Sequence, residues 1–361
     1  MKMIRIIGVI IALFIAIGFS AARAQEVKPA PNTLADAQVV SIVDTGKVNQ
    51  QNKQKITTVT FKVLSGKYSG KTYTVEENTI ALPYRIHYNQ GDQVIVTITQ
   101  NPDKTQTVMV TDYNRRPQLL VLLVLFLVVS VAVGRRQGIT SLIGMVISLY
   151  AIAQIVIPSI LEGTNAFTIT MIASLIIIPA TYYPAHGFNK KATIAVASTF
   201  ITLIIVVTLA YIFTAWTKLS GFESEEASFL QASYGSINIL SLLLAGMVIG
   251  ALAVLDDITI SQASIVSSLR KSNNKLSNKE LYKHAMDVGK DHVASLVNTL
   301  ILVYIGAAFP LVLLFYNTPT PISLVLNQEI IATEIVRTLV SSIGIILAVP
   351  ITTYIAVRFG D

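Results

Sequence analysis

Long apolar stretches follow one another along the chain from residue 118 to its end. Each approaches the length of about 20 residues that an α-helix needs to cross about 30 Å of hydrocarbon. A helix satisfies its own backbone hydrogen bonds, so it is the element expected in lipid. The pattern predicts an α-helical polytopic membrane domain of about seven transmembrane helices, at residues 118–133, 139–160, 167–183, 192–216, 237–256, 294–315 and 335–357.

Alternation of apolar and polar residues replaces this pattern between residues 37 and 112. Ile56–Val63 and Val94–Thr99 alternate clearly, and glycines such as Gly66 and Gly70 mark turns between the runs. About five short strands in a segment of this size favour a small all-β barrel of the OB-like or SH3-like kind. The strands are expected near residues 38–44, 56–64, 71–76, 93–99 and 106–111.

The first residues have the layout of a secretory signal peptide. Lys2 and Arg5 precede an apolar run at residues 6–19, and the small-residue segment Ala22–Ala24 resembles a cleavage site. The alternative is an uncleaved anchor helix. The predicted organisation is a signal peptide or anchor at residues 1–24, an extracytoplasmic β domain at 25–116 and a transmembrane helical domain at 117–361.

Composition agrees with a membrane protein. Only 13% of the residues are charged, against about 25% in soluble domains. The chain has no cysteine, which excludes disulfides and Cys-ligated metals. The net charge of +7 comes from basic residues in short loops between apolar runs, so we expect contact with the lipid bilayer and no nucleic-acid partner.

These basic residues occupy alternate loops, as the positive-inside rule requires of cytoplasmic loops. Lys218 is the only basic residue of the opposite loops between spans. Arg115 and Arg116, on the outer side of the first span, are the exception to the rule. We therefore expect a multi-pass protein of the cytoplasmic membrane with the β domain outside and the C-terminus in the cytoplasm. The loops on the cytoplasmic side contain Arg135, Arg136, Lys190, Lys191, Arg270, Lys271, Lys275, Lys279, Lys283, Lys290 and Arg358.

Polar residues inside the apolar runs concentrate in the last three. In the fifth run, small and polar residues recur three or four positions apart, which places them on one face of a helix. Gly246 and Gly250 form a G-x-x-x-G pair that favours close helix packing. An ionised carboxylate in lipid is costly, so Asp256 and Asp257 should face protein, water or a cation, or else cap the span in solvent. The stripe continues through Ala253, Asp257, Ser261, Ser264 and Ser268.

The sixth run opens on the same side with Asp291 and His292, and Asn298 shares a face with Asp291. Carboxylates and an imidazole at one depth could hold a metal or relay protons. The spacing matches no recognised zinc motif, so the metal is unknown, and Asp291 could instead pair with Lys290 or Lys283 near the headgroups. The candidate polar or ion pathway comprises Asp256, Asp257, Ser261, Asp291, His292 and Asn298.

The seventh run contains a second set of candidates. Glu334 and Arg337 are three residues apart, so they are neighbours on one turn and favour a structural ion pair at the outer end. Gly344 belongs to a small face suited to helix packing. Pro350 should kink the helix and free a backbone carbonyl, a feature with which many transporters build ion sites.

Three blocks of the last spans carry a resemblance to a known family. Gly250–Ser261, Gly289–Leu300 and Glu334–Thr353 resemble, in this order, the signature segments of YibE/F-like membrane proteins. The resemblance covers residues 115–357 and, more loosely, the β domain. It implies a bacterial integral membrane protein, supports the choice of candidate residues and does not supply a substrate.

The polar positions favour a transporter or channel for an ion or small solute. The alternative is a non-transporting assembly or signalling protein that binds partners through the β domain and the basic segment 270–290. The motifs of zinc proteases, serine hydrolases and phosphate-binding loops are absent from the sequence, so we expect neither an enzyme nor a cofactor.

Overall fold

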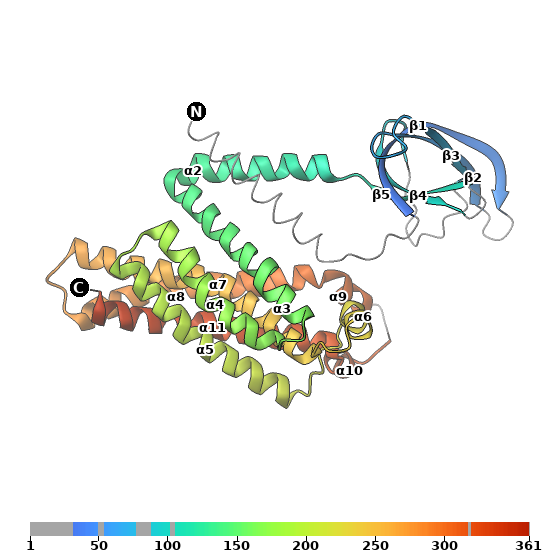
Figure 1. Cartoon of the computed structure of the whole chain (residues 1–361). Coiled ribbons are helices and arrows are strands. Elements are labelled where there is room, and N and C mark those ends of the chain that lie inside the picture. Colours follow the sequence, from blue (N-terminus) through green and yellow to red (C-terminus); the bar gives the residue numbers. More distant parts are fainter. Residues whose placement is uncertain (1–31, 50–53, 77–87, 102–104, 317–318, 361) are drawn as a thin grey trace. The chain divides into compact units, whose positions relative to one another are not determined.

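The computed structural model describes residues 32–49, 54–76, 88–101, 105–316 and 319–360 (Figure 1). The predicted signal peptide or anchor at residues 1–24 lies outside this part of the chain. The chain forms two compact units, one ending at Val129 and the other beginning at Ser130. Each unit is described by itself below.

The first unit contains a single five-stranded sheet in the order β3-β2-β1-β4-β5, with every neighbouring pair antiparallel. The long first strand pairs with both β2 and β4, because register shifts after Val39 and after Asp44 let it bend across the domain. The strands are β1 (Asn32–Asn49), β2 (Gln54–Val63), β3 (Thr72–Glu76), β4 (Gln93–Gln100) and β5 (Gln106–Tyr113).

The sheet curls around one apolar face, as the alternation predicts. Phe61, Val96 and Ile98 are at most 1% exposed, and their sequence neighbours point outward. The edge strands β3 and β5 are joined by side chains, with the Tyr73 hydroxyl donating to Gln106 Oε1 at 2.7 Å. No backbone ladder closes this seam in the described strands. The domain is therefore a curled half-barrel, where the sequence had suggested a barrel.

Two arginines at the end of this domain explain the exception in the charge pattern. Arg115 Nη1 lies 2.7 Å from Asp112 Oδ2, and Arg116 Nη2 lies 2.6 Å from Asp36 Oδ1. Arg115 holds the pKa of the Asp112 carboxyl below its ordinary value through this hydrogen bond. Both arginines therefore have a carboxylate partner close by, so they say less than unpaired cations would about which side of the membrane they occupy.

The second unit is helical and supplies most of the membrane-spanning stretches. Six helical stretches of the described residues are long and apolar enough to cross a membrane. The helical elements, of which α2 begins in the first unit, are α2 (Arg116–Ala151), η2 (Ile152–Val156), α3 (Ile157–Leu161), α4 (Ala166–His186), α5 (Lys190–Trp216), α6 (Glu225–Ser233), α7 (Ile239–Ser272), α8 (Asn278–Ala307), α9 (Phe309–Tyr316), α10 (Ile322–Leu326) and α11 (Glu329–Phe359).

The number of stretches differs from the predicted seven because of the first one. The stretch Arg116–Leu161 is 46 residues long and includes both of the first two predicted spans, 118–133 and 139–160. Arg135, at φ 48° and ψ −125°, breaks it between them. The hydrophobic pattern had divided this stretch into two spans, and here it counts as one, which gives six stretches instead of seven. Seven crossings remain a prediction.

Helices α4, α5, α7 and α11 pack side by side around the main apolar core (Figure 1). In the most apolar stretch of each helix, 61% of the residues of α11 and 56% of those of α7 are buried, against only 6% in α8. The last three spans are therefore not equivalent. Two of them form the centre of the bundle, whereas the apolar part of α8 is covered on few sides.

Two prolines lie within the last two apolar runs, and only one of them coincides with a helix boundary. The run 294–315 is divided, because α8 ends at Ala307 and α9 begins at Phe309, next to Pro310, which has no N–H to continue the ladder. The expected kink at Pro350 does not interrupt α11, which continues to Phe359. Pro350 still leaves the Ile346 carbonyl without its usual backbone donor.

Candidate functional site

Asp256 lines a pocket of about 180 Å³ between helices of the second unit. Asp256 is the eighteenth of the 34 residues of α7, so it lies near the middle of that helix. The pocket is formed by η2, α2, α4, α5 and α7, and π-helical turns such as η2 often occur beside functional sites. Its walls are mainly apolar, and its polar groups come from Ser148, Thr181, Tyr182, Thr199 and Asp256.

Beside this pocket three buried hydroxyls meet. The Tyr182 hydroxyl lies 2.5 Å from Thr199 Oγ1 and 2.5 Å from Thr259 Oγ1, and the two threonine oxygens are 2.8 Å apart. Tyr182 also lies 3.3 Å from the Asp256 carbonyl oxygen, and it is only 1% exposed. Each hydroxyl has one hydrogen to donate, so these contacts cannot all be made at once. The hydrogens can therefore be redistributed without moving heavy atoms.

The other candidates of α7 do not share this pocket. Asp257 is exposed, although it is adjacent to Asp256, and Ser261 is half-buried outside the pocket lining. Gly246 is exposed, with no atom of the described chain within 4 Å of a Cβ built on it, and Gly250 approaches only the Tyr304 hydroxyl at 3.9 Å. Four of the seven residues of the predicted stripe are exposed in this chain, namely Gly246, Ala253, Asp257 and Ser268, and the other three are half-buried.

Among the described residues, no hydrogen bond or ion pair joins Asp257 to the candidates of α8. Gly289 is the residue of α8 that packs against Gln262 and Val349. Asp291 and Asn298 lie about 200° and 180° around the helix from it, and both are exposed, while His292 is half-buried. Among the described residues, no group of three or more His, Asp and Glu side chains is placed to hold a metal ion.

A second buried polar centre joins α7, α8 and α11. The Gln262 side chain is fully buried, and its Nε2 donates to the Ala285 carbonyl at 2.9 Å and to Thr353 Oγ1 at 2.7 Å. Its Oε1 has no partner in the described structure. A Cβ added at Gly289 would lie 2.5 Å from Val349 Cγ1 and 3.0 Å from the Gln262 amide, so only glycine fits there.

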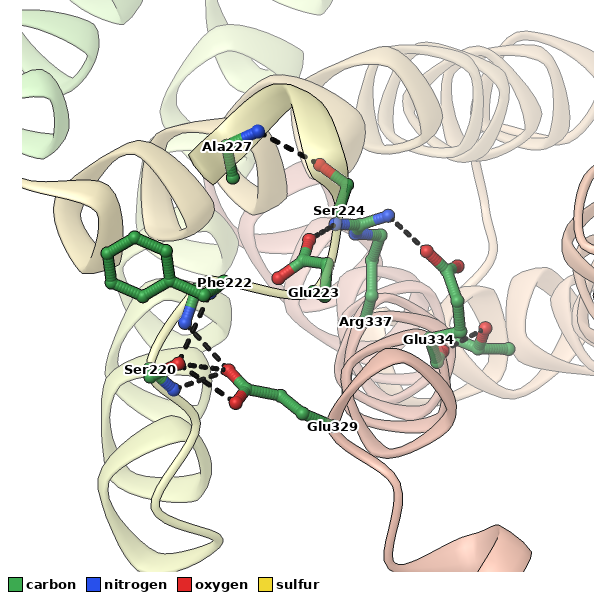
Figure 2. Close-up of polar contacts among 10 residues, drawn as sticks. Ser220, Phe222, Glu223, Ser224, Ala227, Glu329, Glu334 and Arg337 are labelled. Atoms are coloured by element: carbon green, nitrogen blue, oxygen red, sulfur yellow. Dashed lines mark hydrogen bonds and ion pairs between the residues drawn. The ribbon is translucent and has the colours of Figure 1, made fainter. Parts of the chain in front are cut away.

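The predicted pair Glu334–Arg337 forms, and it belongs to a larger cluster (Figure 2). Arg337 Nη1 lies 2.5 Å from Glu334 Oε1, and Arg337 Nη2 lies 3.3 Å from Glu223 Oε1. Figure 2 shows the guanidinium between the two carboxylates, one on its own helix and one on the segment after α5. The pair therefore also ties two distant parts of the chain together.

Glu329 holds the same segment from the first turn of α11 (Figure 2). Its Oε1 accepts from the backbone N–H groups of Ser220 and Gly221 at 2.6 and 2.8 Å, and Oε2 accepts from Ser220 Oγ at 2.9 Å. Gly221 has φ 87° and lies against the Ile239 backbone, where a side chain would clash. The segment 220–224 is thus wedged against the starts of α7 and α11.

Glu223 is the least satisfied carboxylate of this cluster. Its Oε2 is buried without a partner among the described residues. Burial raises the pKa of Glu223 above its ordinary value, Arg337 opposes this, and Glu329 and Glu334 add to the rise. Two carboxylates contact one guanidinium here and Glu329 lies near them, so carboxylates outnumber the arginine in this cluster.

The structure brings together several residues that the sequence pattern does not single out. Hydroxyl residues are common in spans because they can bond to the backbone of their own helix, so the sequence did not mark Tyr182, Thr199 and Thr259 as special. The hydroxyls of Thr199 and Thr259 lie within bonding distance of carbonyls four residues back. Gln262 lies beyond the fifth apolar run, which was predicted to end at residue 256, so a search for polar residues inside the runs does not find it. Glu223 lies 114 residues from Arg337, and spacing alone offers no signal for that contact.

Two family profiles together match most of the chain. The profile of the family described as YibE/F-like protein matches residues 122–360. The chain belongs to this family. The profile of the YibE/F family N-terminal domain matches residues 33–113, so both units of this YibE/F chain are accounted for. No curated protein and no solved structure matches it.

The family assignment and the apolar helices together make this YibE/F-like chain a multi-pass membrane protein. The resemblance inferred from the three sequence blocks is confirmed. Within the region matched by the family profile lie the Asp256 pocket, the Gln262 centre and the Arg337 cluster.

Proposed function

We propose that this YibE/F-like protein transports a small cation across the membrane and that the Asp256 carboxylate binds it. The single observation that supports the proposal is the mid-helix position of Asp256 at a pocket lined also by hydroxyl groups. A carboxylate at membrane depth is expensive unless protein, water or a cation compensates its charge. No catalytic step and no cofactor are part of the proposal.

The size of the pocket favours an ion over a larger solute. Sites for drug-sized molecules usually measure about 300–1,000 Å³, and this pocket measures about 180 Å³. At about 30 Å³ per water molecule, it has room for an ion with a few waters. The walls are mostly apolar, so the carboxylate and the hydroxyls are the groups available to replace a hydration shell.

The hydroxyl network beside Asp256 favours a role for protons. With their contacts to backbone carbonyls included, Tyr182, Thr199 and Thr259 have more hydrogen-bond partners than hydroxyl hydrogens, so their donor directions can reverse. A network of this kind can follow a change of charge at the neighbouring carboxylate. The proposal therefore includes a proton as the simplest transported cation, or as the ion that exchanges with another.

Asp256 and Asp257 offer a matched pair for the test. In vesicles reconstituted with purified protein, we expect Asp256→Asn to reduce cation flux by at least about tenfold, since an interaction with a charged group contributes about 1.5–3 kcal/mol. Asp257→Asn removes the same charge one residue away and should keep the flux. Flux of H⁺, Na⁺, K⁺ and Mg²⁺ is followed with ion-sensitive dyes inside the vesicles.

Two outcomes contradict the proposal. One is wild-type flux in Asp256→Asn, and the other is no flux of any of these ions through the wild-type protein. Equal melting temperatures of the three proteins in detergent would show that a loss of flux is not a loss of folding.

We further propose that the β domain lies outside the cytoplasmic membrane and the α7–α8 connection inside the cell. The distribution of basic residues supports this orientation. The chain has no cysteine, so a single one can be introduced. An impermeant maleimide should label Ser69→Cys in intact cells and Asn274→Cys only after permeabilisation; the reverse pattern would exclude this orientation.

A second candidate function, assembly without transport, is favoured by the exposed polar face of α8. Asp291, Ser295 and Asn298 are exposed on this helix, which is among the stretches apolar enough to span a membrane. Polar groups facing lipid are costly, and polar side chains commonly join helices within membranes. This face is therefore a candidate contact with another protein chain.

A further inference from the structure

A second pocket, larger than that of Asp256, opens between the start of α5 and the end of α7. It measures about 460 Å³, within the range of about 300–1,000 Å³ of small-molecule sites. Its lining combines basic and hydroxyl groups from two helices with an apolar part. The basic residues of the lining are Lys190, Lys191, Arg270 and Lys271, and its hydroxyl residues include Ser264 and Ser268.

Four cationic side chains line this pocket, and none of its described lining residues is acidic. Lys190 and Lys191 begin α5, whereas Arg270 and Lys271 end α7, so two basic pairs about 80 residues apart in sequence converge. The positive-inside rule accounts for basic residues on this side of the membrane. It does not account for their convergence on one concave site.

Two short distances show that the guanidinium of Arg270 is bonded within the chain at the wall of this pocket. Its Nη1 donates to the Leu276 carbonyl at 2.8 Å and its Nη2 to Asn278 Oδ1 at 2.6 Å. A charged group that is already oriented loses little freedom when it binds a ligand. Arg270 is therefore an oriented cation at the wall of the pocket, and Lys190, Lys191 and Lys271 are the other cations of the lining.

The start of α5 adds backbone donors to the same wall. Asn189 caps this helix, and its side chain accepts from the Ala192 N–H at 3.0 Å. The N–H groups of Lys190 and Lys191 precede that bond, at the end of a helix where the peptide dipoles favour an anion. Hydroxyls of Ser264 and Ser268 line the pocket on the α7 side. Lysine, arginine, hydroxyl and helix N–H groups are the donors that usually bind phosphate.

We infer that this pocket binds the phosphate group of an anionic ligand. The inference does not depend on transport, because the pocket shares no lining residue with that of Asp256. The phosphate could belong to an anionic phospholipid or to a soluble phosphorylated molecule. The apolar part of the lining, which includes Ile194, Val266 and Leu281, provides a surface for the remainder of either ligand.

Two sets of lysine substitutions with the same change of charge test this inference on the full chain. The pocket variant is Lys190→Gln/Lys191→Gln/Lys271→Gln. The control is Lys275→Gln/Lys279→Gln/Lys283→Gln, whose residues are exposed, lie in or near the α7–α8 connection and do not line the pocket. A second pocket variant, Ser268→Asp, places a carboxylate at an exposed position of the lining and keeps all the lysines.

Binding is measured in two arms, which identify the source of the phosphate. One arm compares the melting temperature in phosphatidylcholine nanodiscs with and without phosphatidylglycerol. The other titrates inorganic phosphate into the protein in phosphatidylcholine alone. The wild type and the control should be stabilised in at least one arm, and both pocket variants should lose more than about tenfold in affinity there, since each removes or opposes charge-assisted bonds.

Stabilisation in the first arm alone identifies a lipid headgroup, and in the second arm alone a soluble phosphate compound; either result supports the site. Equal losses in the pocket variant and the control would show an unspecific effect of net charge and overturn it. So would the absence of stabilisation of the wild type in both arms. Melting temperatures in phosphatidylcholine alone, equal to that of the wild type, show that the variants are folded.

Discussion

Asp256 and Asp257 are adjacent in the sequence, yet their surroundings differ because successive residues of an α-helix point about 100° apart. One carboxylate lines a pocket and the other is exposed. Two such steps, about 200°, separate Gly289, which packs into the bundle, from Asp291, which is exposed. At the scale of single residues, the face on which a side chain lies decides more than its chemical type.

Glu223 provides a test of pH dependence at this scale. Its pKa is raised from the ordinary value of 4.5 mainly by burial, so the folded protein holds this proton more tightly than the unfolded chain. Stability from this group is complete at pH below 4.5 and is lost as the pH rises through the raised pKa. Glu223→Gln cannot titrate. Its melting temperature relative to the wild type should therefore increase between pH 4.5 and 7.

The control for this measurement is Glu226→Gln, two helical residues into α6 at an exposed position. It should follow the pH profile of the wild type. Parallel profiles of Glu223→Gln and the wild type would contradict the assignment of the raised pKa to Glu223.

At the scale of elements, close approach of helices depends on a few glycines. Gly344 of α11 packs against Val206 of α5, where an added Cβ would overlap Val206 Cγ2. Val206 is 2% exposed and β-branched, so it has little freedom to yield. Gly246 of α7 faces open space instead. Both glycines had been candidates for helix packing, and only the first packs within this chain.

The two glycines give opposite predictions for the same substitution. Gly344→Ala should destabilise the protein by about 1–3 kcal/mol, the usual cost of overpacking a core. Gly246→Ala should be neutral or stabilising by up to about 1 kcal/mol, because alanine favours the helix. Thermal unfolding in detergent measures both. Equal melting temperatures of the two variants would show that the α5–α11 contact tolerates a methyl group.

At the scale of the whole molecule, the helices of the bundle are covered unequally. Helices α7 and α11 are mostly surrounded, whereas the apolar part of α8 is largely exposed and carries Asn298 on its outward side. An amide both donates and accepts, so two copies of Asn298 can pair across a two-fold axis. The assembly candidate therefore predicts contact between α8 helices of two chains.

A cysteine placed on this face tests the contact, because the chain has none of its own. Asn298→Cys should form an oxidised dimer in membranes, since a disulfide requires Cα atoms within about 7 Å. Ile204→Cys on α5 is the control, at a position 59% exposed on another helix. Dimers at both positions would indicate random collision, and none at Asn298→Cys would exclude a two-fold contact there.

Local regularities made much of the architecture predictable. The alternation of Val94–Thr99 and the apolar runs of the last spans are set by hydrogen bonding and burial within each element, so they are visible in the sequence. The pair Glu334–Arg337 is of the same local kind, because three residues separate its members. The family blocks also lie within single segments, and the family profile agrees with them.

Contacts between elements were decided only by the tertiary structure. The sequence by itself determined the two units, the helical stretches and the polar residues that deserved testing, because periodicity and length act within an element. It did not determine that Asp256 rather than Asp257 faces a pocket, that Tyr182 meets Thr199 and Thr259, or that Arg337 reaches Glu223. Those outcomes depend on how each helix is rotated against its neighbours, and packing of the whole bundle sets that rotation.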